Sequence, residues 1–381
     1  MKRTLTTLLF IVFLSSQAIS SSIFDPTIMG VGARPMALGR AYTAMADDVS
    51  SIFTNPAGLS YIKGFGFTSM KANLMTDIGY TMLGVANRFS FGEIGFGWVN
   101  SSLPTIPLTR FSSTGIVETY GYTDYSFNAF VLSYSNSLGG IFKKGALKDV
   151  SVGASLKYFR QGFSANTGAM EGSQGTGFNM DAGAIYKPNN WINLGLSASN
   201  LLPAGMGGKF DWQKDHTQED IPAVYKIGTA IKVIGADGLR RLGSSEVTFS
   251  FDTEFRQTQV QTPALMHGGA EWKIAKPLCI RLGFDQQPAS NASLARVETN
   301  YSCGVGFKLQ DYTFDYAYHQ FGELAENATH YISISYAMND MPSVKRPEIE
   351  QPKSEPSAHG TSTSTDDLGG KINKSNTDED E

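Results

Sequence analysis

The chain has 381 residues, of which 41% are hydrophobic and 12% aromatic, and it contains 40 glycines. This mixture suits strands joined by tight turns, and it excludes both a helical membrane protein and a disordered chain. The formal net charge of -4 at pH 7 gives no electrostatic reason to expect a nucleic-acid partner. The 2 cysteines are too few for a disulfide framework.

The first residues have the pattern of a secretory signal peptide. Lys2 and Arg3 form a basic start, an apolar run follows over about residues 5–14, and Ala18-Ile19-Ser20 supplies small residues for cleavage. The apolar run is too short to span a bilayer comfortably. We therefore expect residues 1–20 to be a cleaved signal peptide of an exported protein.

Residues 21–60 form a compact stretch rich in small residues, unlike anything that follows. Pro35 is placed to open a short helix, which Gly39 weakens, so that packing would have to hold it. The residues that would share one face of this helix are Ala37, Ala41, Ala44 and Met45. We expect the stretch to act as a hatch or plug inside the domain that follows; the alternative is a cap helix outside it.

From residue 61 to residue 340 the pattern has period 2, which is typical of strands with one apolar and one polar face. About fourteen such segments can be counted, most of them about ten residues long, as a tilted strand needs to cross a hydrocarbon core. They cover residues 62–74, 79–89, 91–101, 124–135, 148–161, 175–187, 191–200, 222–233, 244–257, 266–274, 277–286, 297–308, 310–321 and 328–338.

The connections alternate in length. Long ones, such as residues 100–123 and 201–221, alternate with mostly shorter ones, such as residues 187–190 and 310–311. Bacterial outer-membrane barrels have short periplasmic turns and long outer loops. The sequence therefore predicts an all-β protein, a transmembrane antiparallel β-barrel of about fourteen strands in the bacterial outer membrane. The alternative is a large soluble β-sandwich or propeller.

The polar face of the strands carries several charged residues. Charges on the lipid side of a membrane barrel are costly, so this face must line the interior. These residues are Glu93, Lys157, Asp181, Asp252, Glu254, Arg281 and Asp315.

No motif of an enzyme is present. Gly30-x-Gly32 lacks the last glycine of a dinucleotide fingerprint, and the five histidines have no metal-ligand spacing. Asp47 and Asp48 are adjacent and do not share a helix face, so they suggest a solvated helix end. We expect no enzyme activity, no catalytic residues, no cofactor and no metal site.

Residues 341–381 are rich in Pro, Ser, Thr, Asp, Glu and Lys and have few large apolar residues. Such a segment cannot bury enough surface to fold alone. We expect a disordered periplasmic tail, or alternatively a tail that binds a partner protein.

The stretch from Gly32 to Tyr42, followed by Ala46-Asp47-Asp48 and Asn55-Pro56-Ala57-Gly58-Leu59, resembles the N-terminal region of FadL-type outer-membrane long-chain fatty acid transporters. It is even more similar to their relatives grouped with PorV, an outer-membrane protein of a bacterial secretion system. Residues 329–336, at the end of the last strand, are also similar to how that group ends.

The resemblance implies a fourteen-stranded barrel whose N-terminal segment folds inward as a hatch. Its hatch motif would be Asn55, Pro56, Ala57 and Gly58, and its hatch helix region would contain Gly32, Ala33, Arg34, Gly39, Asp47 and Asp48. The resemblance also implies passive transport of long-chain fatty acids or another hydrophobic ligand, released sideways into the outer-membrane lipid. The apolar mature N-terminus suggests Phe24, Ile28 and Met29 as ligand contacts. The alternative function is a PorV-like scaffold with a periplasmic or secretion-system protein as its partner.

Overall fold

The computed structural model describes residues 25–338, except residues 75–76, 143, 165–171, 243, 258–262, 276, 289–296 and 322–327. The expected signal peptide, Phe24 and the expected tail lie outside the described residues. None of the helices in the described part of the chain is both long and apolar enough to cross a bilayer.

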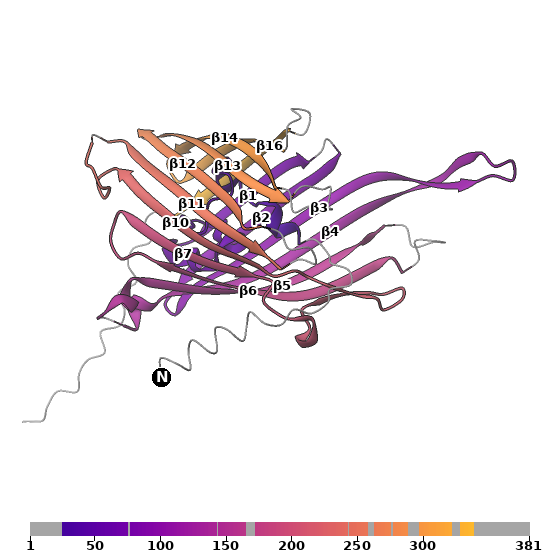
Figure 1. Ribbon diagram of the computed structural model, residues 1–381, viewed down its shortest axis with the longest axis horizontal. Coiled ribbons are helices and arrows are strands. Elements are labelled where there is room, and N and C mark those ends of the chain that lie inside the picture. Colours follow the sequence, from indigo (N-terminus) through magenta and orange to yellow (C-terminus); the bar gives the residue numbers. More distant parts are fainter. Residues whose placement is uncertain are drawn as a thin grey trace, which may run out of the picture. The chain divides into compact units, whose positions relative to one another are not determined.

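The chain forms a closed antiparallel β-barrel (Figure 1). The sheet has 16 strands, and all of them except the short β8 and β9 build the wall, so the barrel has fourteen strands. Each wall strand pairs with the next along the chain, and the last pairs with the first. The wall strands are β1 (Gly66–Leu74), β2 (Ile78–Phe89), β3 (Gly92–Phe111), β4 (Val117–Ser137), β5 (Val150–Phe163), β6 (Gln174–Tyr186), β7 (Ile192–Ser199), β10 (Val224–Ile234), β11 (Glu246–Arg256), β12 (Leu265–Ala275), β13 (Leu278–Pro288), β14 (Val297–Leu309), β15 (Tyr312–Gln320) and β16 (Ala328–Ala337).

Every segment that period 2 predicts corresponds to one wall strand, but the connection predicted over residues 100–123 is wrong. β3 continues to Phe111 and β4 starts at Val117, so that most of this region is a two-stranded ribbon extending beyond the other strands (Figure 1). The ribbon contains Pro104 and Pro107, which a central strand would not accommodate. Because this part of β3 pairs only with β4, each proline lies on an edge strand, where the missing N–H costs little.

The other connections keep the predicted asymmetry. β14 and β15 are joined by Gln310 and Asp311 alone, whereas the connection from β7 to β10 contains η6 (Ala204–Met206), β8 (Lys209–Trp212) and β9 (Gln218–Asp220). The turn between β4 and β5 is longer because it holds η3 (Leu138–Gly140) and η4 (Ala146–Asp149). We call the end of the barrel that carries the Gln310–Asp311 turn the short-turn end.

The polar strand faces point inward and the apolar faces point outward. All seven charged residues predicted to line the interior are buried, with exposed fractions of 6% or less. The outward faces carry exposed Leu, Phe, Tyr and Ile side chains on all sides of the barrel. The two cysteines follow the same rule, since Cys279 is buried and Cys303 is exposed, and both are free.

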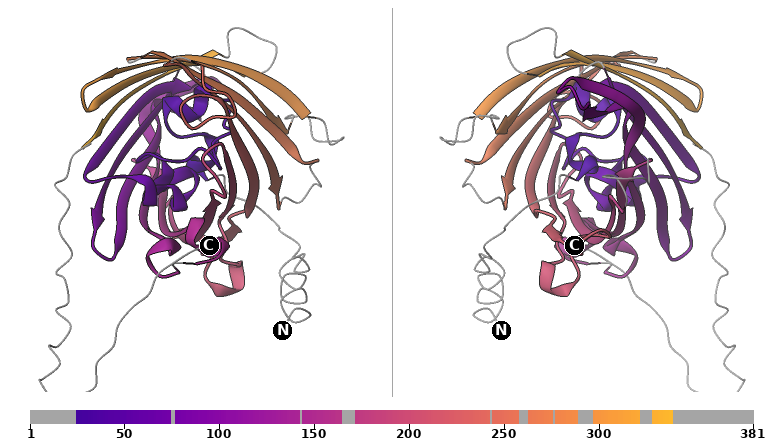
Figure 2. Two further views of the ribbon diagram at one scale, coloured as in Figure 1. Left: turned by 90° about the vertical axis from the view of Figure 1, so that its left-hand side faces the viewer. Right: turned by 90° about the vertical axis from the view of Figure 1, so that its right-hand side faces the viewer.

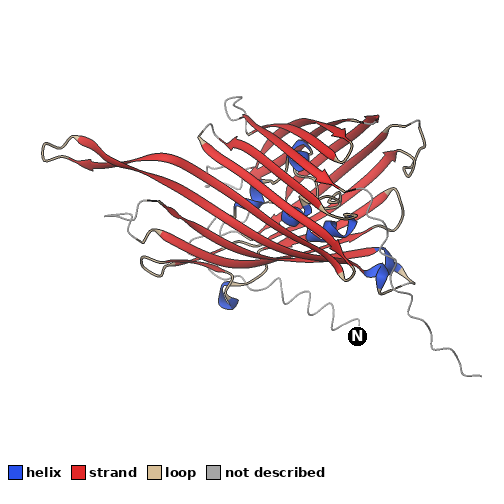
Figure 3. Cartoon of the chain, turned by 180° about the vertical axis from the view of Figure 1, so that it is seen from behind, coloured by secondary structure: helices blue, strands red, loops and turns tan. Residues whose placement is uncertain are grey.

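The N-terminal segment, residues 25–62, lies inside the barrel (Figures 2 and 3). It contains four short helices, η1 (Pro26–Met29), α2 (Ala33–Ala37), α3 (Ser51–Thr54) and η2 (Pro56–Tyr61). The helix predicted to run from Pro35 to Met45 is wrong in its length, because α2 ends at Ala37. Gly39 and Arg40 both adopt left-handed backbone conformations, with φ of 58° and 63°, which no right-handed helix can contain.

Candidate functional site

Inward-facing glycines allow the N-terminal segment to touch the wall around most of the barrel. A Cβ atom placed on any of eleven wall glycines would stand 3.3 Å or less from an atom of the segment. Their missing side chains therefore make the room that the segment occupies. These glycines are Gly66, Gly84, Gly95, Gly97, Gly153, Gly183, Gly195, Gly228, Gly269, Gly283 and Gly304.

Arg34 of α2 connects the segment to the wall and to itself. Its guanidinium forms a bidentate pair with Glu271 of β12, at 2.9 and 3.1 Å, and a 2.6 Å ion pair with Asp47. Arg34 also donates to the hydroxyl of Tyr42, which donates to Asp48. Burial would lower the pKa of Arg34, but the carboxylates of Asp47 and Glu271 raise it well above its ordinary value. Arg34 therefore stays charged, and it fixes α2 to residues 47–48.

Arg40 makes the corresponding connection further along the segment. Its guanidinium forms ion pairs with Glu254 of β11, at 3.3 Å, and Asp285 of β13, at 3.4 Å. It also donates to the carbonyl oxygen of Ile28, which closes the segment on itself. Glu254 receives a second cation, Lys226 of β10, at 2.9 Å. The buried carboxylates are thus balanced by cations from both the segment and the wall.

The start of the segment is held by another buried ion-pair cluster. Lys157 of β5 lies 2.7 Å from Asp25 and 2.8 Å from Asp181 of β6. Asp25 also caps η1 by accepting from the backbone of Thr27. Tyr80 of β2 donates to the carbonyl oxygen of Pro26. Side chains from β2 and β5 therefore fix η1, and Asp181 of β6 pairs with Lys157 behind it.

Asn55 of the predicted hatch motif contacts β6 and β7, the two neighbouring wall strands that pair over the shortest length. β6 and β7 share five register pairs, from Ala182–Ala198 to Tyr186–Leu194, and every other neighbouring pair of wall strands shares more. The amide nitrogen of Asn55 donates to the carbonyl oxygens of Ala184 and Leu196, one on each side of this ladder, and to that of Thr43. The oxygen of the same amide accepts from the backbone of Ala57.

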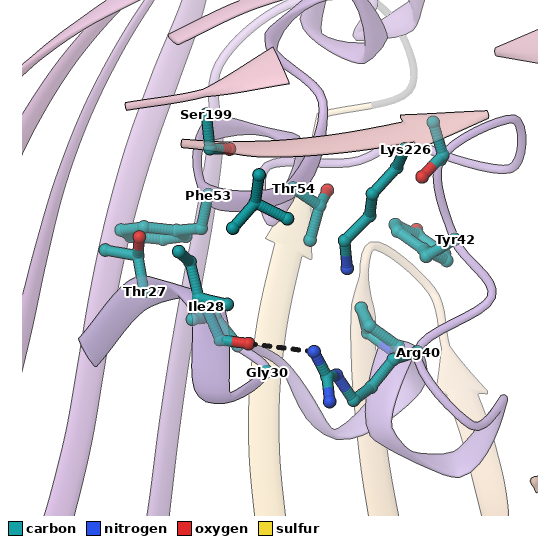
Figure 4. Close-up of a pocket in the computed structure, with 13 residues that line it drawn as sticks. Thr27, Ile28, Gly30, Arg40, Tyr42, Phe53, Thr54, Ser199 and Lys226 are labelled. Atoms are coloured by element: carbon teal, nitrogen blue, oxygen red, sulfur yellow. Dashed lines mark hydrogen bonds between the residues drawn. The ribbon is translucent and has the colours of Figure 1, made fainter. Parts of the chain in front are cut away.

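A small cavity lies between the segment and the wall (Figure 4). The centre of a water molecule can reach about 40 Å³ of it, which holds a few waters but not a long acyl chain. Arg40 and Lys226 face each other across it, and the carbonyl oxygen of Ile28 accepts from Arg40 (Figure 4). Its apolar lining consists of Ile28, Val31, Pro35, Phe53 and Val224.

An aromatic cluster that the sequence did not reveal lies inside the barrel beside η1. Phe127 of β4 contacts Phe159 of β5 and Phe210 of β8, with ring centroids 6.0 and 6.2 Å apart. Phe210, which is fully buried, also contacts Trp212 at 5.2 Å. The available signal was the alternate residues Phe127, Ala129 and Val131, which make the inner face of β4 apolar where other strands carry polar residues.

The predicted site residues lie in several different places. Of the residues predicted for the hatch helix region, only Ala33 and Arg34 are helical, and Gly32 precedes α2. Because the helix ends early, Gly39 lies in a turn, and Asp47 and Asp48 lie in irregular backbone. The structure brings Arg34, Asp47 and Asp48 together, but Gly39 contacts β13 instead. Of the expected ligand contacts, Ile28 lines the cavity, and Met29 packs against the main apolar core.

The barrel is similar to several solved structures. They include the monoaromatic hydrocarbon channel CymD, with a TM-score of 0.54 and 12% identity over 81% of this chain and 98% of that one. The toluene transporter TodX of P. putida has a TM-score of 0.53 and 14% identity, covering 82% and 99%. The toluene transporter TbuX of Ralstonia pickettii has a TM-score of 0.52 and 13% identity, covering 81% and 98%.

At these identities the likeness shows the fold. No protein-family model matches the sequence, and no curated protein matches it either. The resemblance to FadL-type proteins and the transmembrane barrel of fourteen strands are confirmed at the level of the fold. This fold indicates a bacterial outer-membrane protein.

Proposed function

We propose that the protein is a passive outer-membrane transporter for hydrophobic small molecules and that residues 25–62 are its hatch. The observation that carries the proposal is the way in which the segment is held. It makes ion pairs and side-chain hydrogen bonds with the wall, and none of its described residues belongs to a strand of the sheet. A segment held in this way can shift without opening the barrel.

The size of the cavity supports a hatch that moves. An apolar ligand needs far more room than about 40 Å³, because pockets that enclose drug-sized ligands have volumes of about 300–1,000 Å³. The segment therefore has to move for a ligand to pass. The aromatic cluster of Phe127, Phe159 and Phe210 is buried, and it would give a ligand apolar contacts once the segment moves.

The ladder between β6 and β7 is the place where we propose lateral release. It is the shortest in the wall, and Asn55 joins both of its strands to the hatch. A movement of the hatch would remove these two hydrogen bonds together. Release into the bilayer keeps an acyl chain out of water, which saves about 0.8 kcal/mol per CH₂.

The ligand class that we propose is long-chain fatty acids, with small aromatic hydrocarbons as the competing class. Arg40 and Lys226 face the cavity and could attract a carboxylate, although both already pair with Glu254. The aromatic cluster suits either class, and the similar structures include toluene transporters.

The deciding experiment is uptake of labelled oleate and labelled toluene by a transporter-deficient strain that expresses the protein. Uptake of either compound above that of the empty strain is the expected result, and their ratio identifies the class. Assembly has to be verified by the faster migration of the compact folded barrel in unheated gels than of the unfolded chain in heated ones. No uptake of either compound by an assembled barrel would overturn the transport proposal.

The second proposed function is a PorV-like scaffold that binds exported or secretion-system proteins in the periplasm. The closed interior favours it, since a scaffold needs no passage. Affinity purification of cross-linked protein from the native host tests it. Specific recovery of periplasmic or secretion-system proteins, together with no uptake, would favour the scaffold over the transporter.

A further inference from the structure

The outward-facing side chains of β4 and β5 change from apolar to aromatic to polar with distance from the short-turn end. Three successive cross-strand pairs show the change: Leu132 with Leu156, then Phe130 with Tyr158, then Asn128 with Arg160. Leu132 and Leu156 are 52% and 60% exposed, as expected of side chains that face lipid. The sequence of an apolar, an aromatic and a polar pair is what the depth profile of a membrane predicts.

The aromatic pair belongs to a longer row. Trp98 of β3 pairs with Phe130, and Phe178 of β6 pairs with Tyr158, so that four aromatic residues lie side by side on four neighbouring strands. The rings of Phe130 and Tyr158 are 6.2 Å apart, and those of Tyr158 and Phe178 are 4.9 Å apart. Aromatic girdles of this kind mark the boundary between hydrocarbon and headgroups.

A groove of about 630 Å³ lies directly above this row, away from the short-turn end. Its floor begins at Phe130 and Tyr158, and it continues past Asn128 and Arg160 to Gln174. It is therefore apolar at the level of the girdle and polar beyond it.

Arg160 is the one cation among the residues that line this groove. Its side chain is exposed and makes no ion pair with any residue in the described ranges. The one carboxylate among the lining residues, Asp124, is occupied, since it accepts from the backbone of Thr105 at 2.8 Å. Asn128 is also fixed, because its oxygen accepts from both Trp98 and Asn100.

We propose that this groove binds a phosphorylated lipid of the outer leaflet. Arg160 would pair with the phosphate, because a guanidinium binds phosphate through two parallel hydrogen bonds. Phe130 and Tyr158 would contact the junction between headgroup and acyl chains, and the chains would continue along Leu132 and Leu156. A free anion would explain Arg160 but not the apolar surface that continues below it.

The experiment is native mass spectrometry of the detergent-solubilised full-length protein with bis-phosphorylated lipid A as the probe. Phosphatidylcholine and inorganic phosphate serve as comparison ligands. We expect lipid A to remain bound, and Arg160→Glu to lower the bound fraction by about 10-fold, since charge-assisted hydrogen bonds to phosphate are lost and a repulsion is added. Arg160→Lys should retain most of the binding.

Arg110→Glu is the matched control, because Arg110 lies on the ribbon outside the groove, over the ring of Tyr120. The proposal is overturned if Arg160→Glu and Arg110→Glu bind lipid A equally, or if phosphatidylcholine binds as well as lipid A. It is also overturned if millimolar inorganic phosphate displaces lipid A, which would identify a simple anion site. Arg160→Gln replaces Arg160→Glu if the latter fails to assemble, with the same criteria.

Discussion

Gly39 of the N-terminal segment and Gly283 of β13 lie backbone against backbone inside the barrel. The amide nitrogen of Gly39 is 2.2 Å from the position that a Cβ atom on Gly283 would take. The same nitrogen donates to the hydroxyl of Ser302, on the neighbouring strand. No side chain separates the segment from the wall here, so this contact is sensitive to added volume.

Replacing Gly283 by valine is therefore expected to push the segment away from the wall. Overpacking of this kind costs about 1–3 kcal/mol. We expect a lower melting temperature of the barrel and faster entry of small sugars into liposomes that contain it, because the displaced segment closes the interior less well. Gly140→Val is the matched control, since a Cβ at Gly140 meets nothing within 4 Å. Equal rates of sugar entry for the two variants would contradict the proposal that the segment closes the interior.

A disulfide between the segment and β2 should lock the hatch. Cγ1 of Val49 lies 3.3 Å from the position of a Cβ on Gly84, close enough for two cysteines to be bridged. In a protein with Cys279 and Cys303 replaced by serine, we expect oxidised Val49→Cys/Gly84→Cys to lose uptake of the hydrophobic ligand. A reductant should restore it.

Each single cysteine variant, oxidised in the same way, controls for damage by the oxidant. Formation of the bridge can be read from the mass of the peptide that joins the two positions. Full uptake by the bridged protein would show that the ligand passes without movement of residues 25–62.

The wall could be predicted from the sequence because its signal is local. Successive side chains of each strand face lipid and interior in turn, so apolar and polar residues alternate within the strand itself. The ribbon of β3 and β4 was missed because the predicted strands ended at residues 101 and 124, whereas pairing of β3 and β4 with each other continues beyond the wall. The early end of α2 was missed because it depends on the contact of Gly39 with a strand some 240 residues away.

The contacts of the segment could not be predicted, because they join residues far apart in the sequence. Arg34 and Glu271 are separated by 237 positions, and neither lies in a sequence motif that predicts contact with the other. The wall glycines are equally uninformative alone, since a glycine in a strand interrupts the apolar pattern without showing what fills the space. The resemblance identified Asn55, but only the structure shows that it joins β6 and β7.

The ion pair between Arg34 and Asp47 predicts that the stability of the folded protein depends on pH. Partial desolvation would raise the pKa of Asp47, whose side chain is still 46% exposed, but the Arg34 guanidinium outweighs it and lowers the pKa below its ordinary value. A carboxyl whose pKa is lowered by folding stabilises the folded state above its unfolded pKa, about 3.9 for Asp. This contribution is lost as the pH falls through the lower pKa of the folded state.

The melting temperatures of the natural protein and Asp47→Asn should therefore differ by a constant amount between pH 5 and pH 8. Below about pH 4 the difference should shrink, since the natural protein then loses the charge that the variant lacks. Asp237→Asn is the control, because Asp237 lies in an exposed turn between β10 and β11, outside the segment. A difference in melting temperature that stays constant down to pH 3 would show that the charge of Asp47 does not stabilise the fold through Arg34.

Asn55 gives the sharpest test of lateral release, because one side chain joins the hatch to both strands of the shortest ladder. Its amide nitrogen donates to three carbonyl oxygens and is completely buried. Asn55→Ala removes these bonds and should cost about 1–3 kcal/mol. Asn55→Asp keeps the shape but sets a carboxylate oxygen against carbonyl oxygens, so it should destabilise more.

For the same reason Asn55→Asp should raise the rate of ligand release more than Asn55→Ala does. The measurement is the transfer of a fluorescent fatty acid from the protein to liposome lipid, after reconstitution. Ser60→Ala is the control, since the hydroxyl of Ser60 donates to the carbonyl oxygen of Ala57 within the segment. If both Asn55 variants assemble and release ligand at the natural rate, the ladder between β6 and β7 is not the exit, and the hydrogen bonds of Asn55 serve stability alone.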